Sequence, residues 1–418
     1  MPVEPVRPPT LGRAPALRRA ALAAVLLAGL LAPAGCGERG AVAEARDAGA
    51  RPAAAAPAAP SPVAPAPAGP PTALAPQPAR VADSSFAATI ARLSEPGGYF
   101  DTDNLVSNET SVLHALETLE RRGVRGGAYV GVGPEQNFSY IAAVRPAIAY
   151  VIDVRRDNLL QHLWYKALFA LARDPGEFLA LATGRPAPAG AAGRPIEEVV
   201  RLVDAAAPTE RSAAEARRRV RETVRGFRVP LDSADRATID RIHDAFIAAG
   251  LDLRFTSHNR PPRASYPSLR DIVLARDRAG RLAGFLSTPE RFATVKRLQA
   301  ADRVVPVVGD LAGPKALAAI GDDARRRGLA ISVFYTSNVE YYLARDGSLG
   351  RFARTVAALP RDARSTLVRS CFGFACGPGH TAALPGHHSV QLTQTLAYFA
   401  ATVDEGTPYE ELVRRGRP

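Results

Sequence analysis

Residues 126–158 read GGAYVGVGPEQNFSYIAAVRPAIAYVIDVRRDN, and this stretch is the strongest indication of the fold class. Residues 128–132 form a short apolar run ended by a glycine, which is typical of a buried strand. Residues 136–144 carry apolar side chains on roughly one helical face, which predicts a short helix. Residues 148–152 form a second apolar run, and it stops at Asp153. This order predicts a βαβ unit and an α/β fold with a mostly parallel sheet.

The turn after the first strand has the residue types of a ligand-binding loop. Gly131 and Gly133 allow a tight bend and a close approach of a ligand to main-chain N–H groups. The helix that follows directs its positive end at the same place. Asp153 lies 20 residues after Gly133, at the spacing where such units place a carboxylate for ribose hydroxyls.

These residues resemble the first motifs of class I S-adenosylmethionine-dependent methyltransferases, an acid-x-Gly-x-Gly loop and a ribose-binding acid after the second strand. Tyr129 stands where the family has its first acid, and Glu135 stands where a third glycine would fall. The resemblance implies a doubly wound, Rossmann-like sheet with S-adenosylmethionine as the cofactor. It implies cofactor contacts from the turn and the following strand ends: Gly131, Gly133, Glu135, Asp153 and Asp310.

Two further apolar runs, residues 303–308 and 330–334, predict the next strands, and Pro306 indicates an irregular or edge position. In the resembled family the third strand often ends in Gly-Asp beside the adenine, which corresponds to Asp310. The fourth strand of that family carries residues at the reacting end. The candidates for catalysis are therefore the polar groups after this strand: Tyr335, Asn338 and Glu340.

The segment before the first strand is rich in polar side chains, and methyltransferase-like proteins often fold such a segment over the cofactor. The candidate contacts are its acids and amides: Asp101, Asp103, Asn104, Asn108 and Glu109. Turn and helix-cap roles explain the same residue types equally well.

The chain from about residue 174 to 302 departs from strand–helix alternation. Helical patterns there predict a largely helical insertion, suited to a lid or to substrate specificity, with helices near residues 197–203, 213–224, 234–247 and 290–299. Residues 366–371 predict a further strand, and residues 390–403 predict an amphipathic helix. Cys371 and Cys376 are close enough in sequence for a disulfide, whereas the spacing of His380, His387 and His388 matches no zinc pattern.

The N-terminal residues indicate export. Residues 1–36 resemble a lipoprotein-type signal peptide, with arginines before a short apolar run that ends in small residues and Cys36. An ordinary secretory or anchor segment with an incidental cysteine is the alternative. Residues 37–82 are rich in alanine and proline and predict a disordered tether, so the folded domain is expected at residues 83–418. We expect an exported lipoprotein that contacts the membrane through Cys36 and faces the periplasm or the cell exterior.

The net charge of +12 does not indicate nucleic-acid binding, because only three of the 53 basic residues are lysines and no basic cluster interleaves with aromatic residues. Two classes of function remain open. One is a methyltransferase acting on an unknown acceptor. The other is a non-catalytic envelope module that binds a small molecule or a protein. A nicotinamide-dependent oxidoreductase is a weaker third reading, because Gln136 replaces the last glycine of that fingerprint.

We expect Cys36 to carry the lipid anchor, because a basic segment and a short apolar core lead directly into it. Cells expressing the wild-type protein should incorporate an alkyne fatty acid into it, and the Cys36→Ser variant should not. Equal labelling of the two proteins would contradict the lipoprotein assignment.

Overall fold

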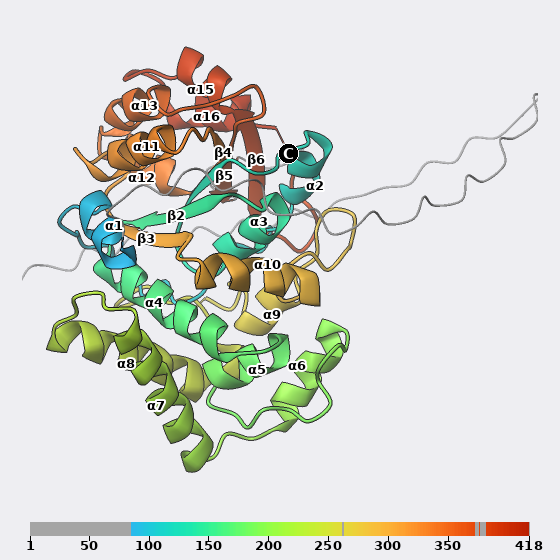
Figure 1. Cartoon of the computed structure of the whole chain (residues 1–418). Coiled ribbons are helices and arrows are strands. Elements are labelled where there is room, and N and C mark those ends of the chain that lie inside the picture. The colour runs from blue at the N-terminus through green and yellow to red at the C-terminus, as the bar shows by residue number, and fades with distance from the viewer. Residues whose placement is uncertain (1–84, 261–262, 373–375, 377–381, 418) are drawn as a thin grey trace, which may run out of the picture. The chain divides into compact units, whose positions relative to one another are not determined.

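The computed structural model describes residues 85–260, 263–372, 376 and 382–417. They form an α/β fold around a six-stranded sheet of order β3-β2-β1-β4-β5-β6 (Figure 1). Strands β1 to β5 run parallel, and β6 is antiparallel to β5. The bounds are β1 (Ala128–Val132), β2 (Ile148–Asp153), β3 (Val304–Val308), β4 (Ile331–Ser337), β5 (Thr366–Phe372) and β6 (Ser389–Thr395). The predicted α/β class with a mostly parallel sheet is confirmed, and it is compatible with a Rossmann-like fold.

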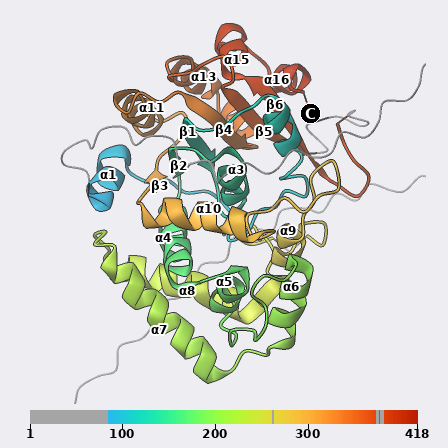
Figure 2. The same ribbon diagram turned by 45° about the vertical axis from the view of Figure 1, so that its right-hand side comes forward.

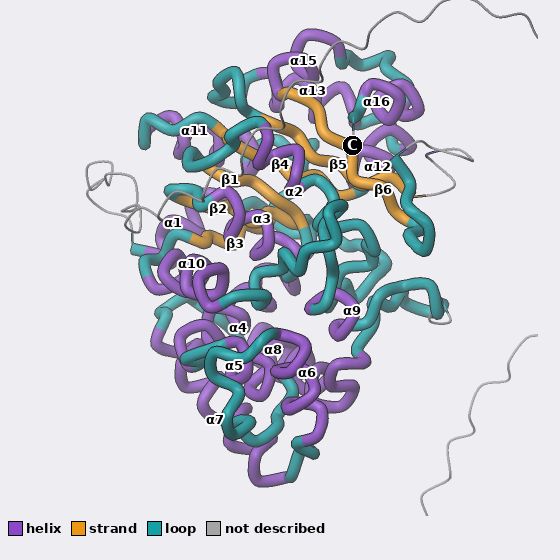
Figure 3. The backbone as a smooth tube through the Cα atoms, turned by 90° about the vertical axis from the view of Figure 1, so that its right-hand side faces the viewer, coloured by secondary structure: helices purple, strands orange, loops and turns teal. Residues whose placement is uncertain are grey.

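Helices cover both faces of the sheet. Figure 1 shows α11, α13 and α15 above the strands and α4 below them, and Figure 2 shows α10 between the sheet and the lower helices. Helices α5, α7 and α8 pack on α4, so in Figure 3 they lie farther from the strands. The helices of the sheet layers are α1 (Phe86–Leu93), α2 (Leu116–Arg121), α3 (Gln136–Val144), α4 (Arg156–Leu171), α11 (Ala316–Arg326), α12 (Val339–Arg345), α13 (Leu349–Ala357), α15 (Leu396–Thr402) and α16 (Tyr409–Arg415).

The four helices predicted within residues 197–299 are present as α6, α7, α8 and α10. The stretch from residue 174 to 302 also contains α5, α9 and the short helix η1. The bounds are α5 (Pro175–Ala182), α6 (Ile196–Ala205), α7 (Glu210–Gly226), α8 (Ser233–Ala249), η1 (Gly250–Asp252), α9 (Leu269–Val273) and α10 (Pro289–Ala300). None of the helices that the structure describes is long and apolar enough to cross a membrane. The predicted signal peptide, Cys36 and tether lie outside the described residues.

The predicted βαβ unit is confirmed. Every residue of β1 is buried, which explains why its sequence is apolar without alternation. The two strands pair in parallel with Gly131 opposite Val151, and α3 crosses between them. Pro306 lies in β3 at the edge of the sheet, as predicted. Proline has no N–H to donate, and an edge strand tolerates this because one of its sides has no neighbouring strand.

The prediction of a helix over residues 390–403 is wrong for the first half of that range. Residues 389–395 form β6, and only residues 396–402 are helical. Leu392 lies opposite Arg369, and Val390 lies opposite Cys371, so β6 completes the edge that β5 would otherwise expose. This pairing outweighs the local helical pattern.

An ion pair at this end of the sheet is completely enclosed. Arg369 in β5 donates from Nε to Glu340 Oε2 at 2.6 Å, and its Nη2 donates to Gln394 Oε1 at 2.9 Å. Arg369 is 0% exposed and Glu340 is 1% exposed. The prediction that Glu340 is catalytic is contradicted, because its carboxylate neutralises a buried guanidinium between β5, β6 and α12.

Glu340→Ala should lower the free energy of unfolding by about 3–5 kcal/mol, because it leaves the Arg369 guanidinium buried without an anion. Denaturant unfolding monitored by circular dichroism measures the change. Glu405→Ala removes the partner of exposed Arg354 and is the matched control, with a change of about 0.5 kcal/mol or less. Equal stability of Glu340→Ala and the wild type would contradict the structural role.

Candidate functional site

A cavity of about 700 Å³ lies at the carboxyl ends of the parallel strands. Phe100 and Asn104 line it from the segment before α2, and Phe255 and Tyr266 line it from the segment between η1 and α9. Its volume is within the roughly 300–1,000 Å³ typical of small-molecule sites. Residues at or just beyond the end of each parallel strand also line it: Gly133, Asp153, Asp310, Asn338 and Phe372.

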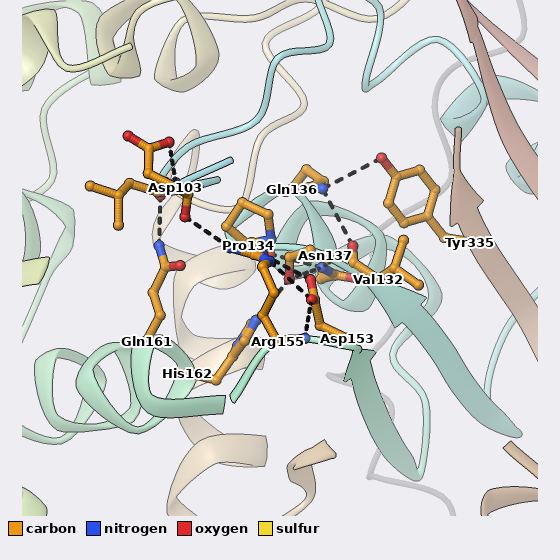
Figure 4. Close-up of polar contacts among 12 residues, drawn as sticks. Asp103, Val132, Pro134, Gln136, Asn137, Asp153, Arg155, Gln161, His162 and Tyr335 are labelled. Atoms are coloured by element: carbon orange, nitrogen blue, oxygen red, sulfur yellow. Dashed lines mark hydrogen bonds and ion pairs between the residues drawn. The ribbon is translucent and has the colours of Figure 1, made fainter. Parts of the chain in front are cut away.

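The turn between β1 and α3 is built around the fully buried side chain of Asn137. Its Nδ2 donates to the main-chain oxygens of Val132, Gly133 and Pro134 at 2.8–3.0 Å (Figure 4). A Cβ on Gly131 would lie 2.1 Å from Asn137 Oδ1. Gly131 is therefore needed for packing. It is not among the residues that line the cavity, and its ligand contact stays a prediction.

Gly133 does line the cavity. Its φ of +82° is a conformation that favours glycine, so any side chain there would strain the backbone. Its carbonyl oxygen accepts from His162 Nε2 at 2.9 Å. Burial lowers the pKa of His162 to about 4, so at pH 7 the ring is neutral and serves as a structural donor.

Asp153 lies at the cavity, as predicted, but it already has a partner. Its Oδ1 accepts from Arg155 N at 2.9 Å and from Arg155 Nε at 3.1 Å, and its Oδ2 accepts from Arg155 Nη2 at 2.9 Å (Figure 4). Because a carboxylate offers about four acceptor positions, roughly one remains for a ligand hydroxyl.

The two candidates from the segment before α2 have different roles. Asn104 lines the cavity. Asp103 does not: its Oδ1 accepts from Thr256 N at 3.1 Å, and its Oδ2 accepts from the Thr256 hydroxyl. Asp103 therefore ties this segment to the chain before α9, and its cofactor contact stays a prediction.

Glu135 points into the protein and does not line the cavity. Its Oε1 accepts from Ser107 N at 2.9 Å, and Tyr165 lies beside its Oε2. Burial raises the pKa of Glu135 to about 7, and Glu109 adds to the shift. The predicted cofactor contact of Glu135 is contradicted, because its carboxyl group joins α3 to the segment before α2.

Asp310 is exposed at the cavity after β3, as predicted. Its main-chain N–H, however, donates to Glu95 Oε1 at 2.9 Å, and the N–H groups of Lys315 and Ala316 donate to Glu95 Oε2. Glu95 therefore occupies the N-terminal end of α11 that would otherwise be open to an anion.

The residues after β4 divide between core and cavity. Tyr335 is fully buried and donates to Glu109 Oε1 at 2.6 Å, so its predicted catalytic role at the cavity is contradicted. Burial raises the pKa of Tyr335 well above its usual value. Asn338 lines the cavity, as predicted. Ser337 also lines it, and its φ is +51°.

Sequence reasoning missed several residues that shape this site. Arg155 and Ser337 lie within two positions of predicted residues, so proximity to a strand end could have identified them. Glu95 lies more than 200 positions from the loop that it occupies, and no local pattern reveals that contact. The aromatic side chains of Phe255 and Tyr266 also line the cavity, and no sequence pattern singled them out.

The described residues contain no group of three or more His, Cys, Asp or Glu placed to hold a metal ion. Cys371 and Cys376 are joined by a disulfide, and His380 lies outside the described residues. His388 lines the cavity, and its Nε2 faces the carbonyl oxygen of Asn108 at 3.2 Å. His387 Nδ1 faces the carbonyl oxygen of Thr110 at 2.8 Å.

Comparison with known proteins gives one family. A model described as a domain of unknown function (DUF7790) matches residues 104–398, well over half of the chain. The matched residues include all six strands and the stretch of helices between β2 and β3. No curated protein matches the chain.

Glu135 should make the stability of the protein depend on pH. Because its pKa rises from 4.5 to about 7 on folding, the folded state holds the proton more tightly. This stabilisation is full below pH 4.5 and is lost as the pH rises through 7. Between pH 5 and 8 the wild type should lose about 2 kcal/mol of unfolding free energy relative to Glu135→Gln. Denaturant titrations at several pH values measure the difference, and parallel pH profiles would contradict it.

Proposed function

The chain belongs to the DUF7790 family, a domain family of unknown function, and from the geometry of its cavity we propose that it binds a nucleoside ligand of the S-adenosylmethionine type. We propose further that it is a membrane-tethered protein of the methyltransferase-like Rossmann class, exported and anchored through Cys36, with an unknown acceptor. One observation carries the proposal. Side chains from the ends of successive parallel strands meet at one cavity, which is where open α/β sheets bind their ligands.

The N-termini of α3 and α11, two of the helices that begin at this edge, favour a ligand without phosphate groups. Pro134 removes one main-chain donor from the turn before α3, and Glu135 places a carboxyl group in the same turn. At α11 the carboxylate of Glu95 already accepts the available N–H groups. Because a dinucleotide needs such donors for its pyrophosphate, S-adenosylmethionine fits this chain better than NAD.

The residues at the cavity fit a nucleoside. Asp153 keeps about one acceptor position for a ribose hydroxyl, and Asn104 and Asp310 add polar groups nearby. Thr102 Oγ1 and Gln136 Oε1 are buried and have no hydrogen-bond partner among the described residues, although both residues line the cavity. Unsatisfied buried polar atoms beside a cavity are expected where a ligand completes the hydrogen bonding.

S-adenosylmethionine supplies an electrophilic methyl group when bound. The role of this protein's own residues is to orient an acceptor and to limit the access of water. Ser337 and Asn338 at the end of β4, with Tyr341 and Tyr342 from α12, line the cavity where the resembled family has its reacting end.

A second candidate is ligand binding without chemistry. Tyr335 and Glu340 are committed to buried contacts, and Tyr129 stands in place of the family's first acid while donating to Asn137 Oδ1. S-adenosylmethionine is made in the cytoplasm, and an exported domain would meet little of it. Binding of S-adenosylmethionine without its consumption in the presence of candidate acceptors would favour this second function.

Asp153→Asn should weaken the binding of S-adenosylhomocysteine about tenfold, measured by calorimetry, because one hydrogen bond to a charged acceptor is lost. We choose asparagine because its oxygen can still accept from Arg155, whereas alanine would leave that guanidinium unpaired. Asp157→Asn, at an exposed pair with Arg241, is the control and should bind like the wild type. Absence of binding by the wild type at millimolar ligand would contradict the proposed function.

A further inference from the structure

Glu109 is a buried carboxylate next to the cavity without a cationic partner. It is 1% exposed, and its Oε1 accepts from the hydroxyls of Tyr335 at 2.6 Å and Ser337 at 2.5 Å. Its Oε2 accepts from Gln391 Nε2 at 2.5 Å. No lysine or arginine forms an ion pair with it within the part of the chain that the structure describes. Its charge is therefore held by neutral donors alone.

This carboxylate fixes the direction of the hydrogen bond from Ser337. The Ser337 hydroxyl donates to Glu109 Oε1 at 2.5 Å, so its single hydrogen points to Glu109. Ser337 lines the cavity, and its oxygen can then only accept from a ligand. Ser337 has a φ of +51°, which is uncommon for serine. It lies at a register shift between β4 and β5. Local backbone strain of this kind is concentrated at functional sites.

The same carboxylate also orients Gln136. The hydroxyl hydrogen of Tyr335 is taken by Glu109, so the Tyr335 oxygen must accept from Gln136 Nε2, at 3.5 Å (Figure 4). Nε2 also faces the Val132 oxygen at 3.4 Å, which rules out the flipped amide. Gln136 Oε1 is left as a buried acceptor without a partner among the described residues. Two residues that line the cavity are thus limited to acceptor oxygens by one carboxylate.

We propose that Ser337 and Gln136, oriented by Glu109, form a subsite for a protonated amino group of the ligand. The subsite rests on the proposed function in that the same cavity binds the ligand. Acceptor oxygens need a donor, and the uncompensated charge of Glu109 favours a cation over a neutral hydroxyl. Carboxylates and phosphates are repelled. The ring of Tyr342 lines the same cavity and can attract a cation.

Arginines at the cavity do not reverse this preference. The guanidinium of Arg155 is paired with Asp153, and that of Arg260 is paired with Asp101. Arg263 and Arg345 are exposed and lie over the rings of Tyr266 and Tyr341. Glu109, in contrast, is enclosed, so water screens its charge less.

The test uses three small probes with the same ring, titrated into the full-length protein at pH 7: 2-phenylethylamine, 2-phenylethanol and 3-phenylpropanoate. The wild type should bind the protonated amine at least tenfold more tightly than the carboxylate, with the alcohol between them. Equal affinities for amine and carboxylate, or no binding of the amine at 10 mM, would overturn the proposal.

Glu109→Gln keeps the shape and can still accept from Ser337, and Gln391 can turn its unpartnered Oε1 toward the new amide. The amine should lose about tenfold in affinity, and the alcohol should change little. Ser337→Ala should lower the affinities for the amine and the alcohol alike by about tenfold. This variant tests the subsite if Glu109→Gln does not fold. Ser332→Ala, at the other end of β4, is the control, because its hydroxyl donates only to the Ala128 oxygen. An unchanged affinity for the amine in a folded Glu109→Gln or Ser337→Ala protein would refute the subsite.

Failure of the proposed function would look different from failure of the subsite. If S-adenosylhomocysteine does not bind while the amine preference and its loss in Glu109→Gln are observed, the subsite stands and the nucleoside assignment falls. If S-adenosylhomocysteine binds and the three probes bind with equal affinity, the subsite is refuted and the nucleoside assignment stands.

Discussion

The cavity depends on the side-chain amide of Asn137 inside the turn between β1 and α3. Three carbonyl oxygens of the turn accept from this one amide nitrogen, and the amide fits only because Gly131 has no side chain. With its carbonyl groups directed inward, the turn holds Gly133 at the cavity wall. A buried amide with this many partners is costly to disrupt, because its two hydrogens are shared by three carbonyl oxygens, of which only the Gly133 oxygen has another close donor, His162. The glycines of this loop thus serve first to build the turn, and only Gly133 reaches the ligand space.

Acidic side chains of the N-terminal segment fasten it across the carboxyl edge of the sheet. Glu95 accepts from the loop after β3, Asp103 accepts from the chain before α9, and Glu109 accepts from β4 and β6. Glu135 on α3 completes this set by accepting from Ser107. These acidic side chains hold the segments that line the cavity in place. Their carboxyl groups do not line the cavity themselves. This arrangement leaves acceptor oxygens at the part of the cavity wall that Ser337 and Gln136 form.

The balance of donors and acceptors at the cavity bears on the kind of ligand. The N-termini of α3 and α11 are occupied by a proline or an acid, while Ser337 and Gln136 have acceptor oxygens free among the described residues. A ligand with hydroxyl and amino groups and a planar base can donate hydrogen bonds to these acceptor oxygens. Ionised phosphate groups cannot donate to them. S-adenosylmethionine has these groups together with a carboxylate, and the nucleoside proposal and the amine subsite are separately testable.

The sequence by itself determined the α/β class, the βαβ unit at residues 128–153, the edge position of Pro306 and the place of the cavity. These features follow from local periodicity and from the rule that parallel strands end at one edge of the sheet. It also identified Gly133, Asp153, Asp310, Asn104 and Asn338 as cavity residues. Only the tertiary structure decided where the side chains of Glu135, Tyr335, Glu340 and Asp103 point. Their partners lie 28 to 226 positions away in the chain, or in strands whose register no local pattern reveals. Residues 389–395 became a strand for the same reason, because the open edge of β5 offered hydrogen bonds that a helix there would have left unmade.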